Sequence, residues 1–281
     1  MSATPAYIQV TTNVDTEFKQ IIIAELSQIG YDMFEETDNE LITYIDFLDF
    51  NAELLQEIRE KYADLQAFEF ITETVEKQNW NALWESNYQP VQIGEGCIIR
   101  APFHEPQPQF AYELIIEPKM SFGTGHHQTT ESIIRLLFEL DFTQKNVLDM
   151  GSGTGILGIL ACKMGAKRCL GIDNEAWAVA NSQENAVRNA TPNFEARLGS
   201  CEQILGEMFD ITIANINKNI ILADIKSYAQ ATKPNGWLLL SGFFVGDVPD
   251  VVAACAKFGF AHHKQQTKEN WAALLLKKNE I

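Results

Sequence analysis

The chain has 281 residues, of which 46% are hydrophobic and 21% charged, a composition typical of a folded globular protein and too apolar for a disordered one. No apolar run approaches the roughly 18 residues that span a bilayer, and the first residues lack the pattern of a signal peptide, so we expect no membrane contact. The formal net charge of −17 disfavours nucleic-acid binding, which relies on lysine and arginine.

The cysteines indicate the compartment. Their number is odd, and no two stand in a Cys-x-x-Cys pair, which favours free thiols in a reducing cytoplasm over disulfides or a zinc site. The five are Cys97, Cys162, Cys169, Cys201 and Cys255. We therefore expect a cytoplasmic protein without a bound metal.

The negative charge is concentrated at the start of the chain. Residues 1–75 hold 16 acidic and 3 basic side chains, a net charge of −13, whereas the rest of the chain has a net charge of −4. A surface of this kind attracts a basic partner and speeds its approach. The alternative, which we weigh equally on charge alone, is that the acidity only keeps the protein soluble.

Residues 1–75 alternate between strand and helix patterns. The first predicted helix begins after Asp15 and ends at Gly30, and the second begins after Asn51; in both, apolar residues recur at helical spacing. Strands are predicted at residues 7–12, 34–37, 41–47 and 68–75. The resulting β-α-β-β-α-β order predicts a small ferredoxin-like α+β domain.

Residues 76–112 are expected to connect this domain to a larger one. Trp80 and Trp84 stand four residues apart, as on one face of a short helix, and favour interdomain packing over a ligand platform. Prolines at 90, 102, 106 and 108 then break regular structure. From residue 113 to 281, strands alternate with helices, the pattern of a doubly wound, Rossmann-like parallel sheet.

A glycine-rich turn follows a buried strand in this second part. The strand at 146–150 leads into Gly-Ser-Gly-Thr-Gly at 151–155 and then into a helical run from 156 to 164. Glycines at 151, 153 and 155 permit a tight turn and the close approach of a ligand, and the helix start favours an anionic group. A strand, glycine turn and helix in this order predict a nucleotide-binding corner.

The spacing of the glycines and an acidic residue distinguish the candidate ligands. A dinucleotide site has the pattern G-x-G-x-x-G, whereas here the third glycine comes one residue early and Ile156 takes its expected place. Asp173 ends the next strand, where a carboxylate accepts hydrogen bonds from ribose hydroxyls. The two elements together favour an adenosine-containing ligand over NAD and over a purely structural turn.

Two further segments are candidates for the same site. The strand at 210–214 delivers Asn215 to the carboxyl edge of the sheet, where α/β folds bind ligands; the alternative is that Asn215 only caps the next helix. A glycine-rich loop at 121–127 precedes an amphipathic helix, for which Thr129 or Thr130 is a candidate N-cap. The two histidines in that loop have no partners at metal-ligand spacing.

These residues resemble the class I S-adenosylmethionine-dependent methyltransferases, and among them the PrmA family, which acts on large-subunit ribosomal protein eleven. The resemblance is carried by Phe-Gly-Thr-Gly-His at 122–126 with Thr129 and Thr130, by residues 148–157, and by Ala-Asn-Ile at 214–216. It covers nearly the whole chain. It implies a ferredoxin-like substrate-recognition domain at 1–75, a linker at 76–112 and a methyltransferase domain at 113–281.

The resemblance also implies a function and its residues. Methyl groups would pass from S-adenosylmethionine to lysine side chains and the N-terminal amine of a basic ribosomal protein, with Asn215 beside the reacting centre. The residues implied to contact the cofactor are Phe122, Gly123, Thr124, Thr130, Gly151, Gly153, Gly155, Asp173 and Asn215. The alternatives are a methyltransferase for another protein or a small molecule, a non-catalytic binding module of the same fold, and an NAD-dependent dehydrogenase.

Overall fold

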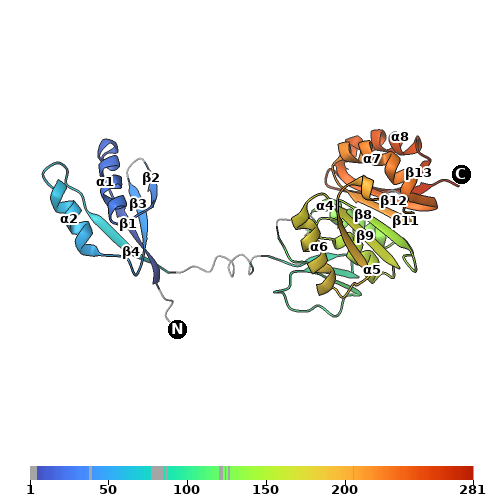
Figure 1. The fold of residues 1–281 in the computed structure, drawn as a ribbon, viewed down its shortest axis with the longest axis horizontal. Coiled ribbons are helices and arrows are strands. Elements are labelled where there is room, and N and C mark those ends of the chain that lie inside the picture. The colour runs from blue at the N-terminus through green and yellow to red at the C-terminus, as the bar shows by residue number, and fades with distance from the viewer. Residues whose placement is uncertain are drawn as a thin grey trace. The chain divides into compact units, whose positions relative to one another are not determined.

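The computed structural model describes residues 5–37, 40–76, 85, 88–119, 123, 125, 127–204 and 206–280. The chain divides into two compact units, Met1–Asn87 and Tyr88–Ile281, which are described separately (Figure 1). The short helix predicted around Trp80 and Trp84 lies outside the described residues.

The first unit is a four-stranded antiparallel sheet with two helices. Its elements are β1 (Pro5–Thr12), α1 (Thr16–Gln28), β2 (Met33–Glu36), β3 (Leu41–Asp46), α2 (Ala52–Tyr62) and β4 (Phe70–Glu76). The strands lie in the order β2-β3-β1-β4, and each neighbouring pair is antiparallel. This is the β-α-β-β-α-β order predicted from the sequence.

Alternate strand residues of the first unit face the helices. Ile8, Val10, Leu41 and Ile45 are buried against apolar residues of α1 and α2, including Ile22, Leu26, Leu55 and Ile58. Asn51 caps α2, accepting a hydrogen bond from the N–H of Glu53 at 2.9 Å, as predicted. Asp15 stands at the N-cap of α1, but within the described residues its side chain makes no capping bond.

The second unit contains a seven-stranded sheet in the order β10-β9-β8-β11-β12-β14-β13. Its strands are β8 (Asn146–Met150), β9 (Arg168–Asp173), β10 (Phe194–Leu198), β11 (Phe209–Asn215), β12 (Thr232–Phe244), β13 (Phe260–Lys268) and β14 (Trp271–Lys278). All neighbouring pairs are parallel except those that involve β14. The doubly wound α/β fold predicted from the sequence is confirmed.

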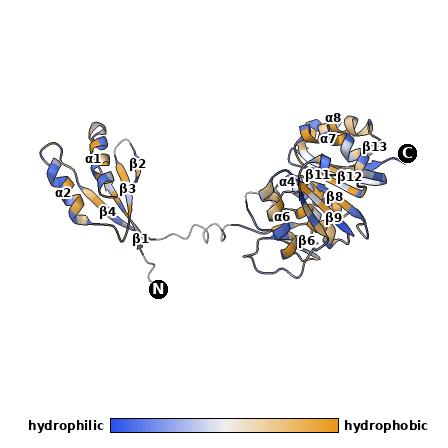
Figure 2. Cartoon of the chain, in the orientation of Figure 1, coloured by the Kyte–Doolittle hydropathy of each residue, from blue (hydrophilic) through white to orange (hydrophobic). Residues whose placement is uncertain are grey.

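Helices cover both faces of this sheet (Figure 1). They are α4 (Gln128–Leu137), α5 (Ile156–Lys163) and α6 (Ala176–Arg188) with one core, and α7 (Lys218–Ala231) and α8 (Val248–Ala256) with the other. Short 3-10 helices occupy Cys201–Ile204 and Val245–Asp247. Successive residues of the buried strands enter opposite cores, which is why these strands are apolar throughout; Figure 2 shows the hydrophobic colour along them.

A second, smaller sheet lies within the segment expected to be a connector. It consists of β5 (Val91–Ile93), β6 (Cys97–Arg100) and β7 (Tyr112–Ile115). Ile93, Ile99 and Leu114 are buried in the same core as α4 and α5. The expectation of irregular structure up to residue 112 is therefore wrong for Val91–Ile93 and Cys97–Arg100, because the prolines fall outside these strands: Pro90 comes just before β5, and those at 102, 106 and 108 come after β6.

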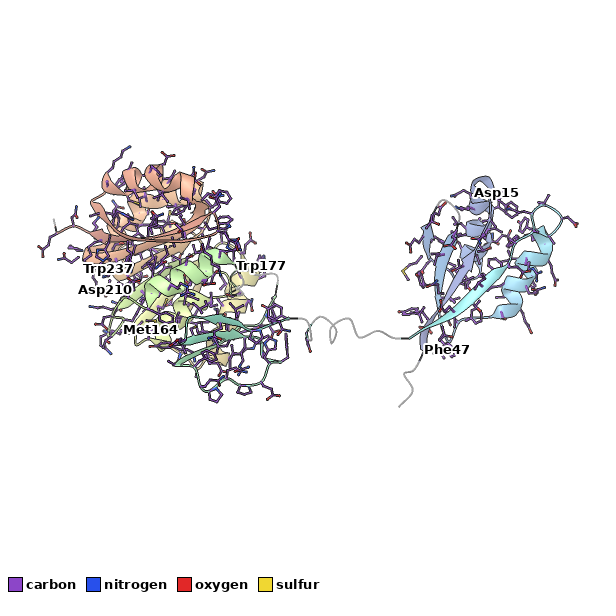
Figure 3. All side chains as sticks on the ribbon, turned by 180° about the vertical axis from the view of Figure 1, so that it is seen from behind. Asp15, Phe47, Met164, Trp177, Asp210 and Trp237 are labelled. Carbon is purple, nitrogen blue, oxygen red and sulfur yellow. The ribbon has the colours of Figure 1, made fainter. Side chains whose placement is uncertain are left out.

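The strand order reverses at β8, because the chain crosses to β9 on one side and later returns to β11 on the other. The carboxyl ends of these three strands meet at one edge. Figure 3 shows Trp177 near that edge, with Asp210 and Trp237 at the opposite one.

All five cysteines are free thiols, as expected. Among the described residues, no helix combines the length and apolarity needed to cross a bilayer.

Candidate functional site

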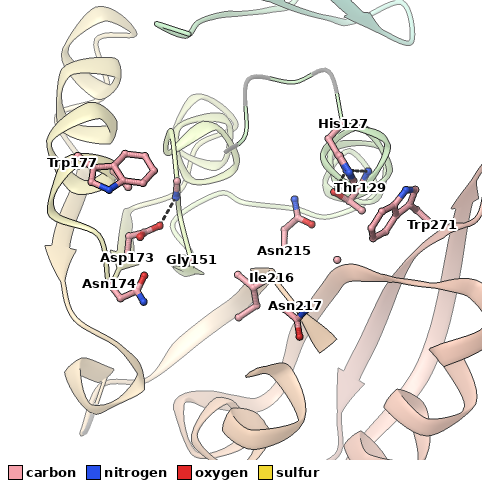
Figure 4. A pocket seen from close by; sticks show the side chains of 13 residues that line it. His127, Thr129, Gly151, Asp173, Asn174, Trp177, Asn215, Ile216, Asn217 and Trp271 are labelled. Atoms are coloured by element: carbon pink, nitrogen blue, oxygen red, sulfur yellow. Dashed lines mark hydrogen bonds between the residues drawn. The ribbon is translucent and has the colours of Figure 1, made fainter. Parts of the chain in front are cut away.

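A cavity of about 430 Å³ opens where the strand order reverses (Figure 4). This volume lies within the range of small-molecule sites. The lining residues are His127, Thr129, Gly151, Gly153, Asp173, Asn174, Trp177, Ala178, Asn215, Ile216, Asn217, Gly242 and Trp271. Four of the residues predicted from the sequence therefore line one cavity: Gly151, Gly153, Asp173 and Asn215.

The glycine turn between β8 and α5 has two parts with different roles. All three predicted glycines have positive φ angles, and Gly151 and Gly153 line the cavity. A Cβ on Gly151 would lie 2.2 Å from Cγ2 of Ile216, so only glycine fits there. Gly155 begins α5, and its Cβ would lie 2.9 Å from the Cβ of Ser182. Gly155 therefore lets α5 pack against α6 and does not line the cavity.

Asp173 ends β9 and orders the turn that faces it. One carboxylate oxygen accepts the N–H of Gly153 at 2.8 Å, and the other accepts the N–H of Glu175 at 3.0 Å. A carboxylate has about four acceptor positions, so two remain for a ligand after these bonds. Trp177 stands beside Asp173, half exposed, with its ring N–H bonded to Glu175 at 3.1 Å.

Asn215 ends β11 on the other side of β8. Its amide nitrogen donates to Oγ1 of Thr130 at 3.5 Å, and its amide oxygen is buried without a hydrogen-bond partner among the described residues. The alternative that Asn215 only caps the next helix is wrong, because Asn217 caps α7 by accepting the N–H of Asn219. A buried polar atom without a partner is costly, so this oxygen is available to a ligand.

The first turn of α4 supplies a third wall. His127 is the N-cap, with Nδ1 accepting the N–H of Thr129 at 3.2 Å, so the prediction that Thr129 or Thr130 caps this helix is wrong. Both threonines lie inside the helix and are buried, and Thr130 does not itself line the cavity. Burial lowers the pKa of His127, and the charge of Glu269 partly opposes this.

The loop before α4 is described only in part. The carbonyl oxygen of Gly123 accepts the hydroxyl of Thr154 at 2.6 Å, which attaches this loop to the glycine turn. Phe122 and Thr124, both predicted to contact a cofactor, lie outside the described residues.

Asp149 lies beneath the glycine turn and is completely buried. It accepts the N–H of Gly158 at 3.0 Å, which holds the start of α5 against β8. Burial raises the pKa of Asp149 to about 7; the bond from Gly158 opposes this, and the nearby charge of Asp173 adds to it. Close to neutral pH, this carboxyl is therefore divided between its protonated and ionised forms.

Sequence reasoning missed the aromatic residues of the cavity. The ring of Trp271, at the start of β14, lies 4.8 Å from that of His127 and 4.3 Å from that of Phe244. Trp271 lies 56 residues after Asn215, and only the return of β14 beside β12 brings the two together. Trp177 had a signal, since it follows Asp173 by four residues and lies in the first turn of the helix after the acidic strand end.

The site is suited to holding a polar, adenosine-like ligand beside an amine. Asp173 offers acceptors for hydroxyl groups, the glycine turn allows close approach, and the oxygen of Asn215 accepts an N–H at the far end. Within the described parts of the chain, no cluster of three or more His, Cys, Asp or Glu residues is arranged to bind a metal ion.

Comparison with known proteins matches this chain to one family over residues 7–279, described as ribosomal protein L11 methyltransferase (PrmA). A protein of that name from Phocaeicola vulgatus is 39% identical over 277 residues, covering 95% of this chain and 98% of the relative. One from Chlorobaculum tepidum is 34% identical, covering 96% of each. The crystal structure of a ribosomal protein L11 methylase from Lactobacillus delbrueckii subsp. bulgaricus is 25% identical with a TM-score of 0.64, covering 69% of this chain and 100% of that one.

Proposed function

The chain belongs to the ribosomal protein L11 methyltransferase (PrmA) family, and from this we propose that it transfers methyl groups from S-adenosylmethionine to amino groups of ribosomal protein L11. The acceptors are lysine side chains and the N-terminal amine. One observation supports this most directly: Asp173 and Asn215, on the two strands that flank β8, line a single cavity. The function places the enzyme in the cytoplasm, where ribosomal proteins are made.

The cavity has the groups that S-adenosylmethionine requires. Asp173 would accept hydrogen bonds from the ribose hydroxyls, Gly151 and Gly153 would allow the ligand to approach the backbone, and Trp177 would cover an apolar surface of it. When bound, S-adenosylmethionine supplies an electrophilic methyl group attached to a sulfonium. Asn215 and the first turn of α4 then stand on the side where the acceptor enters.

The protein contributes mainly by positioning the acceptor amine. Displacement at a methyl group needs the nucleophile in line with the departing group and close to the carbon, and holding it there removes much of the barrier. A lysine must first lose a proton, which from a pKa of about 10.4 costs roughly 4.6 kcal/mol at pH 7. The apolar rings of Trp271, which is partly buried, and Phe244 would shield part of the amine from water, which lowers this cost by disfavouring the charged form.

Asn215 is the residue we assign to the reacting amine. Its buried oxygen accepts an N–H of the amine and so directs the nitrogen lone pair toward the methyl group. An amide oxygen is a weak base, so Asn215 orients the amine and does not remove its proton.

The acidic first unit is proposed to capture the substrate. Residues 1–75 carry a net charge of −13, and an acidic surface speeds the approach of a basic protein while repelling nucleic acid. On this proposal, the first unit binds the substrate and the second unit carries out the chemistry.

The experiment is methyl transfer from radiolabelled S-adenosylmethionine to purified ribosomal protein L11, with mass spectrometry to locate the modified amines. Label on lysine side chains that is lost in Asn215→Ala supports the proposal. Label only on another protein of a ribosomal extract, or binding of S-adenosylmethionine without any transfer, would contradict it. Calorimetry with NAD in place of S-adenosylmethionine tests the dehydrogenase alternative.

A further inference from the structure

A polar contact joins α4 to the hairpin of β13 and β14 next to the cavity. The carboxylate of Glu131 is mostly buried, with 12% of its side chain exposed. One of its oxygens accepts from Arg135 on the same helix, at 2.8 and 3.0 Å, and the other forms an ion pair with Lys268 at the end of β13. Each oxygen of Glu131 therefore has its own cation, and of these two partners Lys268 lies on the hairpin whereas Arg135 lies on α4.

This ion pair lies directly behind two walls of the cavity. Thr130 precedes Glu131, is fully buried, and accepts the hydrogen bond from the amide of Asn215. Lys268 stands opposite Trp271 in the pairing of β13 with β14. Glu131 thus joins the segment that orients Asn215 to the segment that carries Trp271.

Two neighbouring contacts also join the start of α4 to the hairpin of β13 and β14. Gln128 donates to Glu269 at 2.9 Å, and the ring of His127 meets that of Trp271 edge to face at 4.8 Å (Figure 4). Glu269 stands in the tight turn between β13 and β14, with a φ angle of 55°, so the bond from Gln128 connects this turn to α4.

The same two elements are also joined far from the cavity. Beyond the end of α4, Glu139 accepts from Lys264 of β13 at 2.7 and 2.8 Å. Glu139 is more exposed than Glu131, at 35% against 12%, and Lys264 stands opposite Leu275, which does not line the cavity, whereas Lys268 stands opposite Trp271, which does. It provides an ion pair between the segment that follows α4 and the same strand, away from the position of Glu131.

We propose that Glu131, acting through Lys268, is a positioning residue that holds the first turn of α4 and the start of β14 at the separation needed for the acceptor amine to meet Asn215. The inference rests on the proposed function. Loss of the pair changes none of the residues that line the cavity but lets α4 and the start of β14 move apart, so it affects the acceptor side of the site and not the side formed by Asp173.

The test compares Glu131→Gln with Glu139→Gln as the matched control. Glu131→Gln should lower kcat/KM for the protein acceptor by about tenfold or more, since a small displacement of a reacting group has a large effect on rate. The dissociation constant of S-adenosylmethionine should change less than twofold. Glu139→Gln should leave both quantities unchanged.

A second pair of variants tests the contact from the hairpin side. Lys268→Gln should reproduce the loss, and Lys268→Arg, which keeps the cation, should restore most of the wild-type rate. Acrylamide quenching of Trp271, obtained by difference with Trp271→Phe, should increase in Glu131→Gln and Lys268→Gln only.

The outcomes separate this inference from the proposed function. Equal rates for Glu131→Gln and wild type, equal losses in Glu131→Gln and Glu139→Gln, or a parallel loss of S-adenosylmethionine affinity would each overturn the positioning role. If the wild-type protein does not methylate L11, the proposed function fails, whereas the quenching of Trp271 still decides whether Glu131 holds the two walls together.

Discussion

The carboxylate of Asp173 accepts the backbone N–H of Gly153, with 2.8 Å between oxygen and nitrogen. The bond runs from the end of β9 to the glycine turn after β8, so the residue expected to bind ribose also fixes the backbone over which the ligand lies. Recognition and turn geometry are therefore coupled through one side chain.

We expect Asp173→Ala to weaken S-adenosylmethionine binding by about 10- to 100-fold, because hydrogen bonds to a charged group each contribute about 1.5–3 kcal/mol. Isothermal titration calorimetry measures the change. Asp141→Ala is the control, since Asp141 accepts a similar bond, from the N–H of Thr143 at 2.9 Å, but does not line this cavity. Unchanged affinity in Asp173→Ala would refute the assignment.

Asn215→Ala should lower the turnover number by about 100-fold or more, because the acceptor amine loses the group that orients it. The melting temperature should stay within a few degrees of wild type, since the variant loses only the long 3.5 Å bond from the amide nitrogen to Thr130, and the buried amide oxygen has no partner among the described residues. Single-turnover methyl transfer at saturating S-adenosylmethionine measures the effect. Wild-type turnover in this variant would mean that another residue orients the amine.

Gly242→Ala should displace the backbone next to Asn215 and so disturb the site. Gly242 has a φ angle of 100°, and an added Cβ would lie 2.1 Å from the carbonyl oxygen of Ile216, the residue after Asn215. We expect a loss of stability of about 1–3 kcal/mol from the clash and the strained backbone, and a loss of activity. Gly246→Ala, where an added Cβ meets nothing within 4 Å, is the control for urea unfolding and methyl transfer.

The parts of the site that the sequence predicts are those encoded in contiguous residues. A strand, a glycine turn and a helix follow one another at 146–164, and Asp173 and Asn215 each end an apolar strand. Because the carboxyl ends of parallel strands meet at one edge, their proximity follows from the fold class alone. The cap of α2 by Asn51 is likewise local and was predicted from the sequence.

The remaining parts depend on contacts between distant segments. Trp271 reaches the cavity only because β14 runs back antiparallel beside β12, and Gly242 is required both by its φ angle of 100° and by the close approach of Ile216. His127 caps α4 although histidine is not a favoured cap, since the ring also packs on Trp271. Tertiary packing determines the role of each of these residues, and a local sequence pattern does not predict it.

Reversing acidic charges on the open face of the first sheet should slow substrate capture. Glu35, Asp46 and Glu73 stand in register with residues that point away from the buried core, and all three are exposed. Changing all three to lysine shifts the net charge of residues 1–75 from −13 to −7. We expect the association rate with L11 to fall severalfold and its dependence on salt to flatten.

Stopped-flow mixing at several salt concentrations measures this association. The control reverses three exposed glutamates of the second unit, Glu95, Glu105 and Glu280, so the total charge changes by the same amount. If both triple variants slow association equally, overall charge and not this face attracts the substrate; if neither does, the acidity serves solubility.

Asp149 should make the stability of the second unit depend on pH near neutrality. Its pKa is about 7 in the folded protein and about 3.9 in an unfolded chain, so the folded state retains a proton that the unfolded state releases. The stabilisation is fully present below pH ~4 and is lost as the pH rises through about 7, amounting to at most roughly 4 kcal/mol. Asp149→Asn keeps an oxygen for the N–H of Gly158 and removes the titration.

Urea unfolding of wild type and Asp149→Asn between pH 5 and 8 measures the effect. The difference in unfolding free energy should move in favour of the variant as the pH rises. Asp141→Asn is the control without a pH trend: a bond from the N–H of Thr143 lowers the pKa of Asp141, so the stabilisation from that carboxylate is lost only in more acid solution, and its difference from wild type should stay constant between pH 5 and 8. Parallel pH profiles for wild type and Asp149→Asn would show that Asp149 stays ionised despite its burial.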